Sequence, residues 1–155
     1  MSNSTSDSGI DKAQKVVEGV LQELGLDPDA NRMKSVTAGC AWEIGKGSAT
    51  VLISLLPGTA SQPARLRVVS PIVRLSPPLP RALLERLLVL NASEVLGIAF
   101  GLIADGVVVL ATERSVLDLS RVEVAEILAR IGHYADHYDD LLVHEFGGVR
   151  VCDID

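Results

Sequence analysis

The stretch GIAFGLIADGVVVLAT, residues 97–112, decides the fold class. Two apolar runs flank residues 104–106 (Ala-Asp-Gly), and an Asp-Gly pair between such runs is a strong signal for a β-hairpin. In the first run Ile98, Phe100 and Leu102 share one face, because successive side chains of a strand point to opposite sides. The opposite face is made mostly of small residues, which permit close approach by a helix or by a second copy of the chain.

Helical patterns lie at both ends of the chain. Residues 11–24 carry apolar side chains at helical spacing, with Asp11 as a plausible N-cap and Gly25 as the C-terminal stop. Residues 120–146 form the last helix, in which Ser120 and Glu123 make a capping box. Six of its side chains repeat at alternating steps of four and three, which predicts a buried seam: Val124, Leu128, Ile131, Ala135, Tyr138 and Leu142.

Three strands and a helix are predicted between these ends. The strands cover residues 40–44, 49–56 and 65–75, separated by glycine- and proline-containing turns. Pro71 lacks an N–H donor, so we expect it at a sheet edge or a bulge. A helix over residues 81–90 begins just after Pro80. Its leucines are too many to face one small core, which indicates that part of this helix lies in a subunit interface.

The predicted order is α-β-β-β-α-β-β-α, an antiparallel sheet with helices packed on it, and the fold class is therefore α+β. We expect one domain over residues 10–148. Residues 1–9 read as a disordered tail, residues 149–155 as a C-terminal tail, and residues 27–37 as a polar connector.

Composition excludes several classes of function. The chain has 155 residues, a net charge of −6 and a pI near 5.0, which disfavours binding to nucleic acid. No apolar stretch is long enough to span a membrane, and residues 1–9 do not resemble a signal peptide. Two cysteines, Cys40 and Cys152, make no disulfide framework. We expect a cytoplasmic protein.

Only one cluster looks catalytic or metal-binding. His133, His137, Asp140 and His144 form one stripe of the last helix. This stripe is opposite the apolar seam and should face water, so we predict neither a metal nor another cofactor there. Phosphate-loop, nucleophile-elbow and dinucleotide-binding patterns are missing from the sequence, and we expect no enzymatic activity.

Several motifs follow one another in an order that resembles a known family. They are residues 87–91 (Leu-Leu-Val-Leu-Asn), residues 97–102 (Gly-Ile-Ala-Phe-Gly-Leu), residues 106–110 (Gly-Val-Val-Val-Leu) and the pair Ala135-Asp136. The chain is similar to class I type III secretion chaperones of the CesT type and to YbjN-like proteins. The likeness extends from about Lys12 to Gly148.

The resemblance implies a homodimer that holds a segment of a client protein on apolar surface. The residues that it implies for partner binding lie on the first helix and first strand: Val17, Val20, Leu21, Leu24, Trp42 and Ile44. Those that it implies for the dimer interface lie on the middle helix and the strand after it: Leu84, Leu87, Leu88, Ile98 and Phe100.

Two alternatives stay open at this point. One is a dimeric scaffold or regulatory module of the roadblock type, whose architecture has two strands before the middle helix and three after it. The other is a metal- or pH-responsive protein that uses His133, His137 and His144.

Overall fold

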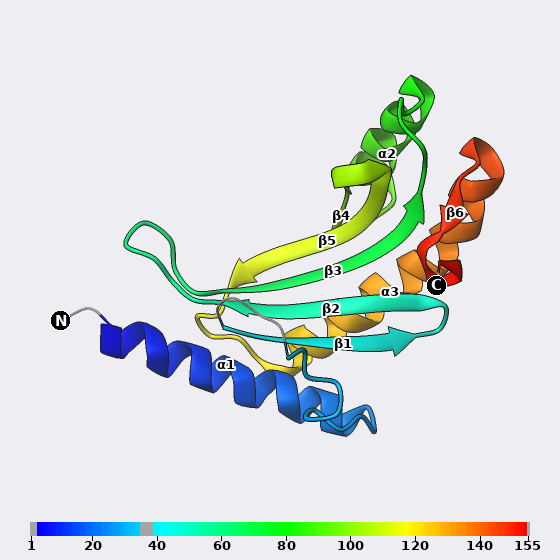
Figure 1. Ribbon diagram of the computed structural model, residues 1–155. Coiled ribbons are helices and arrows are strands. Elements are labelled where there is room, and N and C mark those ends of the chain that lie inside the picture. The colour runs from blue at the N-terminus through cyan, green and yellow to red at the C-terminus, as the bar shows by residue number, and fades with distance from the viewer. Residues whose placement is uncertain (1–2, 35–38, 155) are drawn as a thin grey trace. The chain divides into compact units, whose positions relative to one another are not determined.

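The computed structural model describes residues 3–34 and 39–154 (Figure 1). The described helices are α1 (Asn3–Glu23), α2 (Arg81–Ser93) and α3 (Arg121–Phe146), with short 3-10 helices η1 (Ala104–Gly106) and η2 (Val151–Asp153). The described strands are β1 (Cys40–Lys46), β2 (Ala49–Leu56), β3 (Arg65–Arg74), β4 (Ala99–Ile103), β5 (Val107–Ser115) and β6 (Val149–Arg150). Residues 35–37 of the predicted connector, residue 38, and residues 1–2 and 155 of the predicted tails lie outside the described residues.

The strands of the described residues form one six-stranded antiparallel sheet in the order β1-β2-β3-β5-β4, and β6 pairs with β3. The predicted α+β class and element order are confirmed. β6 adds to them, because Val149 and Arg150 pair with Arg74 and Val73 in a segment that the sequence predicts as a tail. β1 and β4 are the end strands of the order, and each has one outer edge.

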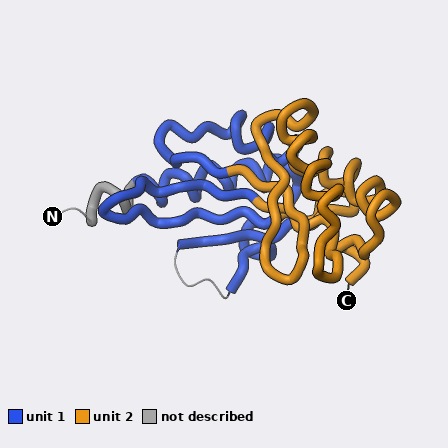
Figure 2. Tube along the Cα trace, turned by 90° about the horizontal axis from the view of Figure 1, so that it is seen from above, with its two compact units in different colours: residues 1–44, 52–68, 113–128 blue, residues 45–51, 69–112, 129–155 orange. Residues whose placement is uncertain are grey.

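Contacts divide the chain into two compact units, coloured separately in Figure 2. Unit 1 contains residues 1–44, 52–68 and 113–128, and unit 2 contains residues 45–51, 69–112 and 129–155. The sequence predicts one domain over residues 10–148, whereas contacts give two units. Five elements contribute residues to both units: strands β1, β2, β3 and β5 and helix α3.

The predicted hairpin is present as β4, η1 and β5. Its register places Phe100 opposite Leu110 and Ile103 opposite Val107. Asp105 (φ 63°) and Gly106 (φ 72°) both adopt left-handed backbone conformations. A Cβ atom at position 106 would lie 2.1 Å from the carbonyl oxygen of Leu75, so only glycine fits there.

Helix α3 confirms the predicted capping box. The Ser120 N–H and hydroxyl each donate to Glu123 Oε2 at 3.0 Å, and the Glu123 N–H donates to Ser120 Oγ at 3.2 Å. All six residues of the predicted seam are buried. These local signals fix where α3 begins and which of its faces is covered.

Helix α1 is longer than predicted, since it begins at Asn3 and places Asp11 inside the helix. Residues 3–10 contain no proline, so a helix nucleated further along the chain can extend through them. The predicted stop is confirmed: Gly25 has a φ of 76°, and the Leu26 N–H donates to Leu21 O at 2.9 Å.

Of the two places predicted for Pro71, the sheet edge is wrong and the bulge stays a prediction. Pro71 belongs to β3, which lies between β2 and β5 in the sheet order. The neighbouring Ser70 is fully buried, and its hydroxyl donates to Thr50 O at 2.8 Å. The Ser70 hydroxyl thus gives the Thr50 carbonyl of β2 a hydrogen-bond donor next to Pro71, which has no N–H of its own.

Candidate functional site

The outer edge of β1 carries a short piece of the preceding connector. The Met33 N–H donates to Ala41 O at 2.8 Å, and the Glu43 N–H donates to Asn31 O at 2.9 Å. Together these bonds form an antiparallel bridge between Arg32 and Trp42. They are the hydrogen bonds that an added strand makes, so this edge of unit 1 can bind an extended backbone.

The side chains around this edge add an aromatic ring and a carboxylate. The Arg32 guanidinium carbon lies 5.8 Å from the centroid of the Trp42 ring, and Arg32 Nη1 lies 3.7 Å from Glu18 Oε1 of α1. Trp42 is fully buried, and its indole N–H has no acceptor among the described residues. The edge therefore brings together backbone groups of β1, the π face of Trp42 and a carboxylate of α1.

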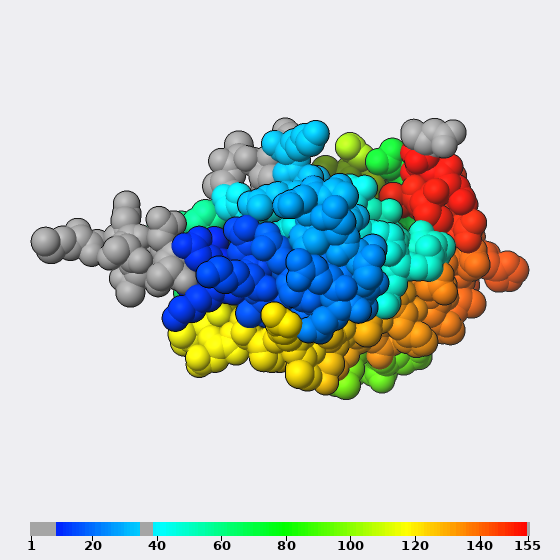
Figure 3. All heavy atoms as spheres, turned by 90° about the horizontal axis from the view of Figure 1, so that it is seen from below, coloured from blue at the N-terminus to red at the C-terminus, as the bar shows by residue number. Residues whose placement is uncertain are grey.

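Helix α1 covers the face of β1 that carries Cys40 and Trp42. The Cys40 thiol lies 3.7 Å from Gln14 Oε1, and burial raises the pKa of that thiol. At its other side α1 lies beside residues 113–128, which are yellow in Figure 3. A Cβ at position 19 would lie 2.7 Å from the Arg121 guanidinium, so Gly19 allows this close approach.

The structure brings the six residues predicted for partner binding into unit 1 but buries five of them. Leu24 is 46% exposed, whereas the others are at most 2% exposed: Val17, Val20, Leu21, Trp42 and Ile44. Leu24 is therefore the one of the six whose side chain a partner can contact directly. The role of this set in partner binding stays a prediction.

The residues predicted for the dimer interface lie in unit 2, and two of the five are exposed. Leu84 is 37% exposed and Leu88 is 69% exposed, while Leu87, Ile98 and Phe100 are buried. Leu84 and Leu88 are one helical turn apart, so they form a short apolar stripe on one side of α2. A contact with a second copy of the chain stays a prediction.

Asn91 continues this stripe and pairs with the outer edge of β4. Its side chain accepts a hydrogen bond from the Phe100 N–H at 2.6 Å and donates one to Phe100 O at 3.1 Å. Both backbone groups of Phe100 are thus occupied on the side away from β5. Because an end strand with free backbone groups invites pairing with another strand, Asn91 closes this edge at Phe100.

An aromatic pair links β4 to α3 in unit 2. The Phe100 and Tyr138 rings meet edge to face, with their centroids 5.2 Å apart. The Tyr138 hydroxyl donates to Glu94 Oε2 at 2.6 Å. Burial, together with this hydrogen bond to Glu94, raises the pKa of Tyr138 to about 12. The phenol is therefore a neutral donor that fixes α3 to the end of α2.

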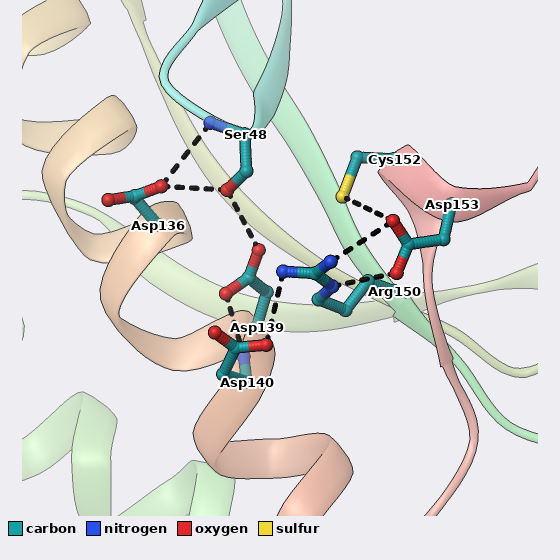
Figure 4. Close-up of polar contacts among 7 residues, drawn as sticks. All are labelled: Ser48, Asp136, Asp139, Asp140, Arg150, Cys152 and Asp153. Atoms are coloured by element: carbon teal, nitrogen blue, oxygen red, sulfur yellow. Dashed lines mark hydrogen bonds and ion pairs between the residues drawn. The ribbon is translucent and has the colours of Figure 1, made fainter.

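A polar network joins the turn between β1 and β2 to α3 (Figure 4). The Ser48 hydroxyl lies 2.7 Å from Asp136 Oδ1 and 3.0 Å from Asp139 Oδ2, so its single proton serves one carboxylate at a time. The hydrogen bonds that Asp136 accepts from the hydroxyl and the backbone N–H of Ser48 hold the pKa of Asp136 below its usual value. Asp136 is the acidic member of the pair that supports the family resemblance, and here it fixes a turn.

Asp139 is the buried member of this network, and sequence reasoning missed it. It is 3% exposed, and its Oδ1 accepts a hydrogen bond from the Asp140 N–H at 2.6 Å. Asp140 in turn pairs with Arg150 at 3.1 Å, and Arg150 pairs with Asp153 at 2.8 Å, which ties the C-terminal segment to α3 (Figure 4). The network therefore connects the turn between β1 and β2, and the C-terminal segment, to α3.

The histidine stripe of α3 faces water, as predicted. His133, His137, Asp140 and His144 are all exposed, and the rings of His133 and His137 lie parallel with centroids 6.4 Å apart. Within residues 3–34 and 39–154, no three His, Cys, Asp or Glu side chains converge in a way that would hold a metal ion. In the same part of the chain, no helix has the length and hydropathy needed to span a lipid bilayer.

The chain belongs to a family of peptide-binding chaperones, because the model of the type III secretion system (YopN, CesT) and YbjN peptide-binding chaperones, TY-Chap1, matches residues 11–154. The family resemblance seen in the sequence is thereby confirmed. Among curated proteins, no sequence matches this chain.

Solved structures share the fold. A chain of the ExsC–ExsE complex is 17% identical with a TM-score of 0.60, covering 85% of this chain and 94% of that chain. The Yersinia pestis type III secretion chaperone SycH, solved with a stable fragment of YscM2, is 18% identical with a TM-score of 0.55, covering 79% of this chain and 96% of that chain. YbjN from E. coli is 13% identical with a TM-score of 0.54, covering 86% of this chain and 93% of that chain. At these identities the likeness establishes the fold.

Proposed function

We propose that this chain is a homodimeric chaperone that holds an extended segment of a partner protein without catalysis. The observation that carries the proposal is the outer edge of β1, which pairs with an extended segment of this chain, residues 31–33. The chain also belongs to a family of peptide-binding chaperones. Holding a segment by its backbone needs no reactive group. A cytoplasmic location is part of the proposal, and two free cysteines are consistent with it.

The client surface lies on unit 1. Backbone groups of Ala41 and Glu43 would pair with the client, and the exposed Leu24 would contact its apolar side chains. The buried Val17, Val20, Leu21, Trp42 and Ile44 give this surface its shape from beneath. Strand addition of this kind accepts many sequences, because main-chain hydrogen bonds supply much of the affinity.

The dimer contact lies on unit 2. Leu84 and Leu88 would pack against the same residues of a second copy, while Leu87, Ile98 and Phe100 support them from within. Burying two leucines in each copy removes apolar surface that otherwise faces water. Asn91 occupies the backbone of Phe100, so this contact would rest on side chains at that point.

The order of elements separates this proposal from a roadblock-type scaffold. Three strands precede α2 in the described chain, whereas the roadblock architecture has two there. Two strands lie between α2 and α3, and the short β6 follows α3, so the discriminating count is the one before α2. For a metal-responsive role, the test is calorimetry: micromolar zinc should give no saturable heat at His133, His137 and His144.

Photo-crosslinking in the native cell tests the client surface. A crosslinking amino acid at Leu24 should capture a partner protein, and the same residue at Leu117 serves as the matched control. Leu117 is 73% exposed and also lies in unit 1. Equal capture at both positions, or none at Leu24, contradicts the proposed surface.

Light scattering after size-exclusion chromatography tests the dimer. Leu88→Asp would place a charge in the proposed contact, so this variant should elute as a monomer while the wild type elutes as a dimer. Leu117→Asp makes the same change at a similarly exposed site and should stay dimeric. A dimeric Leu88→Asp variant would refute the contact.

A further inference from the structure

The segment Asn31–Met33 behaves as a one-bridge strand on the outer edge of β1. In the bridge between Arg32 and Trp42 the hydrogen bonds join the neighbouring residues, Met33 with Ala41 and Glu43 with Asn31. In such a pair the two side chains lie on the same face and closer together than in the other type of antiparallel pair. The geometry thus aligns the Arg32 side chain with Trp42.

The groups around the Arg32 side chain favour a positive charge at this position. The Arg32 guanidinium lies over the Trp42 ring at 5.8 Å and within 3.7 Å of the Glu18 carboxylate. A cation is attracted both by the π face and by the carboxylate, and an anion is repelled by both. The exposed Glu43 and the net charge of −6 add to this preference.

The segment is weakly anchored. None of the side chains of residues 31–34 is buried, and the Arg32 side chain is 40% exposed. The polar turn before it is exposed as well, with the Asn31 amide donating to Asp27 O at 2.7 Å. Without a buried apolar side chain, this segment can be exchanged for a competitor that makes the same two backbone bonds.

We propose that Asn31–Met33 is an internal occupant of the β1 edge, and that the client which replaces it carries an arginine or lysine opposite Trp42. The inference deepens the proposed function and rests on it. The client is an extended protein segment that carries an arginine or a lysine. The residues on either side of this basic residue leave their backbone groups free to bond to β1. Its cation takes the place of Arg32 between Trp42 and Glu18, and its backbone takes over the bonds to Ala41 O and Glu43 N–H.

The test uses a labelled peptide that copies residues 28–34 (PDANRMK) and a second peptide with glutamate in place of its arginine. Binding to the full chain is followed by fluorescence anisotropy. In the variant Arg32→Ala the internal occupant loses its cation, so the arginine peptide should bind about fivefold more tightly than to the wild type. Lys34→Ala removes the same charge two residues away and should leave the affinity within about twofold of the wild type.

The variant Glu18→Gln should reduce the preference for the arginine peptide over the glutamate peptide, because the carboxylate that recognises the cation is gone. Amide hydrogen exchange gives an independent readout. The Glu43 N–H should exchange faster in Arg32→Ala than in the wild type and become protected when the peptide binds.

Two outcomes overturn the inference. If both peptides bind Arg32→Ala equally well, the edge does not select a cation, although strand binding and the proposed function stand. If neither peptide binds and Glu43 exchange is unchanged, the segment is a fixed part of the fold, and strand addition at Ala41 and Glu43 fails together with the inference. Crosslinking at Leu24 then decides separately whether a partner binds unit 1 through side chains.

Discussion

Replacing Asn91 with alanine should destabilise the fold through one backbone site. The Asn91 side chain forms both side-chain hydrogen bonds to the Phe100 backbone, at 2.6 Å and 3.1 Å, and Phe100 is 6% exposed. In Asn91→Ala the Phe100 N–H and C=O lose these partners in a position where water has little access.

The expected loss can be estimated from these two bonds. A buried polar group left without a partner costs about 1–3 kcal/mol, and a typical hydrogen bond contributes about 1 kcal/mol, so we expect a loss of about 2–3 kcal/mol. For a chain of this size that corresponds to a fall in the melting temperature of roughly 5–10 °C. Ser93→Ala is the matched control, because Ser93 is exposed on the same helix and its hydroxyl bonds only to Val89 O.

Circular dichroism during thermal unfolding, at one fixed protein concentration, measures the change. Keeping the concentration fixed matters because dimerisation would make the melting temperature depend on it. Amide exchange at Phe100 should accelerate in Asn91→Ala and not in Ser93→Ala. Equal melting temperatures for the two variants, with an unchanged Phe100 exchange rate, would refute the reasoning.

Two other predictions concern polar contacts. Ser48→Ala removes the hydroxyl that hydrogen-bonds to the buried Asp139, so the free energy of unfolding should fall by about 1–3 kcal/mol. The control Ser61→Ala changes an exposed serine and should cost less than about 0.5 kcal/mol. Denaturant titration measures both values. The backbone and side-chain hydrogen bonds from Ser120 lower the pKa of Glu123, so the capping box stabilises the fold above the ordinary pKa of 4.5 and loses this effect as pH falls through the lower, folded-state value. Unfolding followed from pH 6 to pH 2 should therefore show a smaller acid-induced loss in Glu123→Gln than in the wild type; parallel pH profiles would contradict this.

Local signals account for what the sequence predicted well. The Asp-Gly hairpin, the Ser120–Glu123 capping box and the glycine stop after α1 each depend on residues within a few positions of one another. Such features follow from backbone geometry and short-range hydrogen bonds, so the pattern of residue types is enough to locate them.

Long-range contacts account for the features that could not be predicted from the sequence. Asp139 is bound by Ser48, which is 91 residues away. Helical spacing puts Asp139 nearer to the buried seam than Asp140, but it gives no sign of the hydroxyl that binds this carboxylate. The missing N–H of Pro71 predicts an edge or a bulge, but it does not show that β3 lies between β2 and β5. The Ser70 hydroxyl likewise finds its acceptor, Thr50 O, 20 residues away. Only the folded sheet brings these groups together.

The candidate site shows the same division. Apolar periodicity identified α1 and β1 correctly, but periodicity marks buried residues, and Val17, Leu21 and Trp42 are accordingly in the core. The accessible parts are Leu24 and the backbone edge beside Arg32, which the sequence reading treated as part of a polar connector. A strand edge is made of main-chain groups, so side-chain patterns give no sign of it.

Amide hydrogen exchange of the chain with and without its captured partner tests the central claim most directly. If the chain holds an extended segment on the β1 edge, binding should protect residues 40–44 and the end of α1 near Leu24. The Phe100 amide, already bonded to Asn91, should not change. Protection confined to β4 and α2, with none at residues 40–44, would contradict the account.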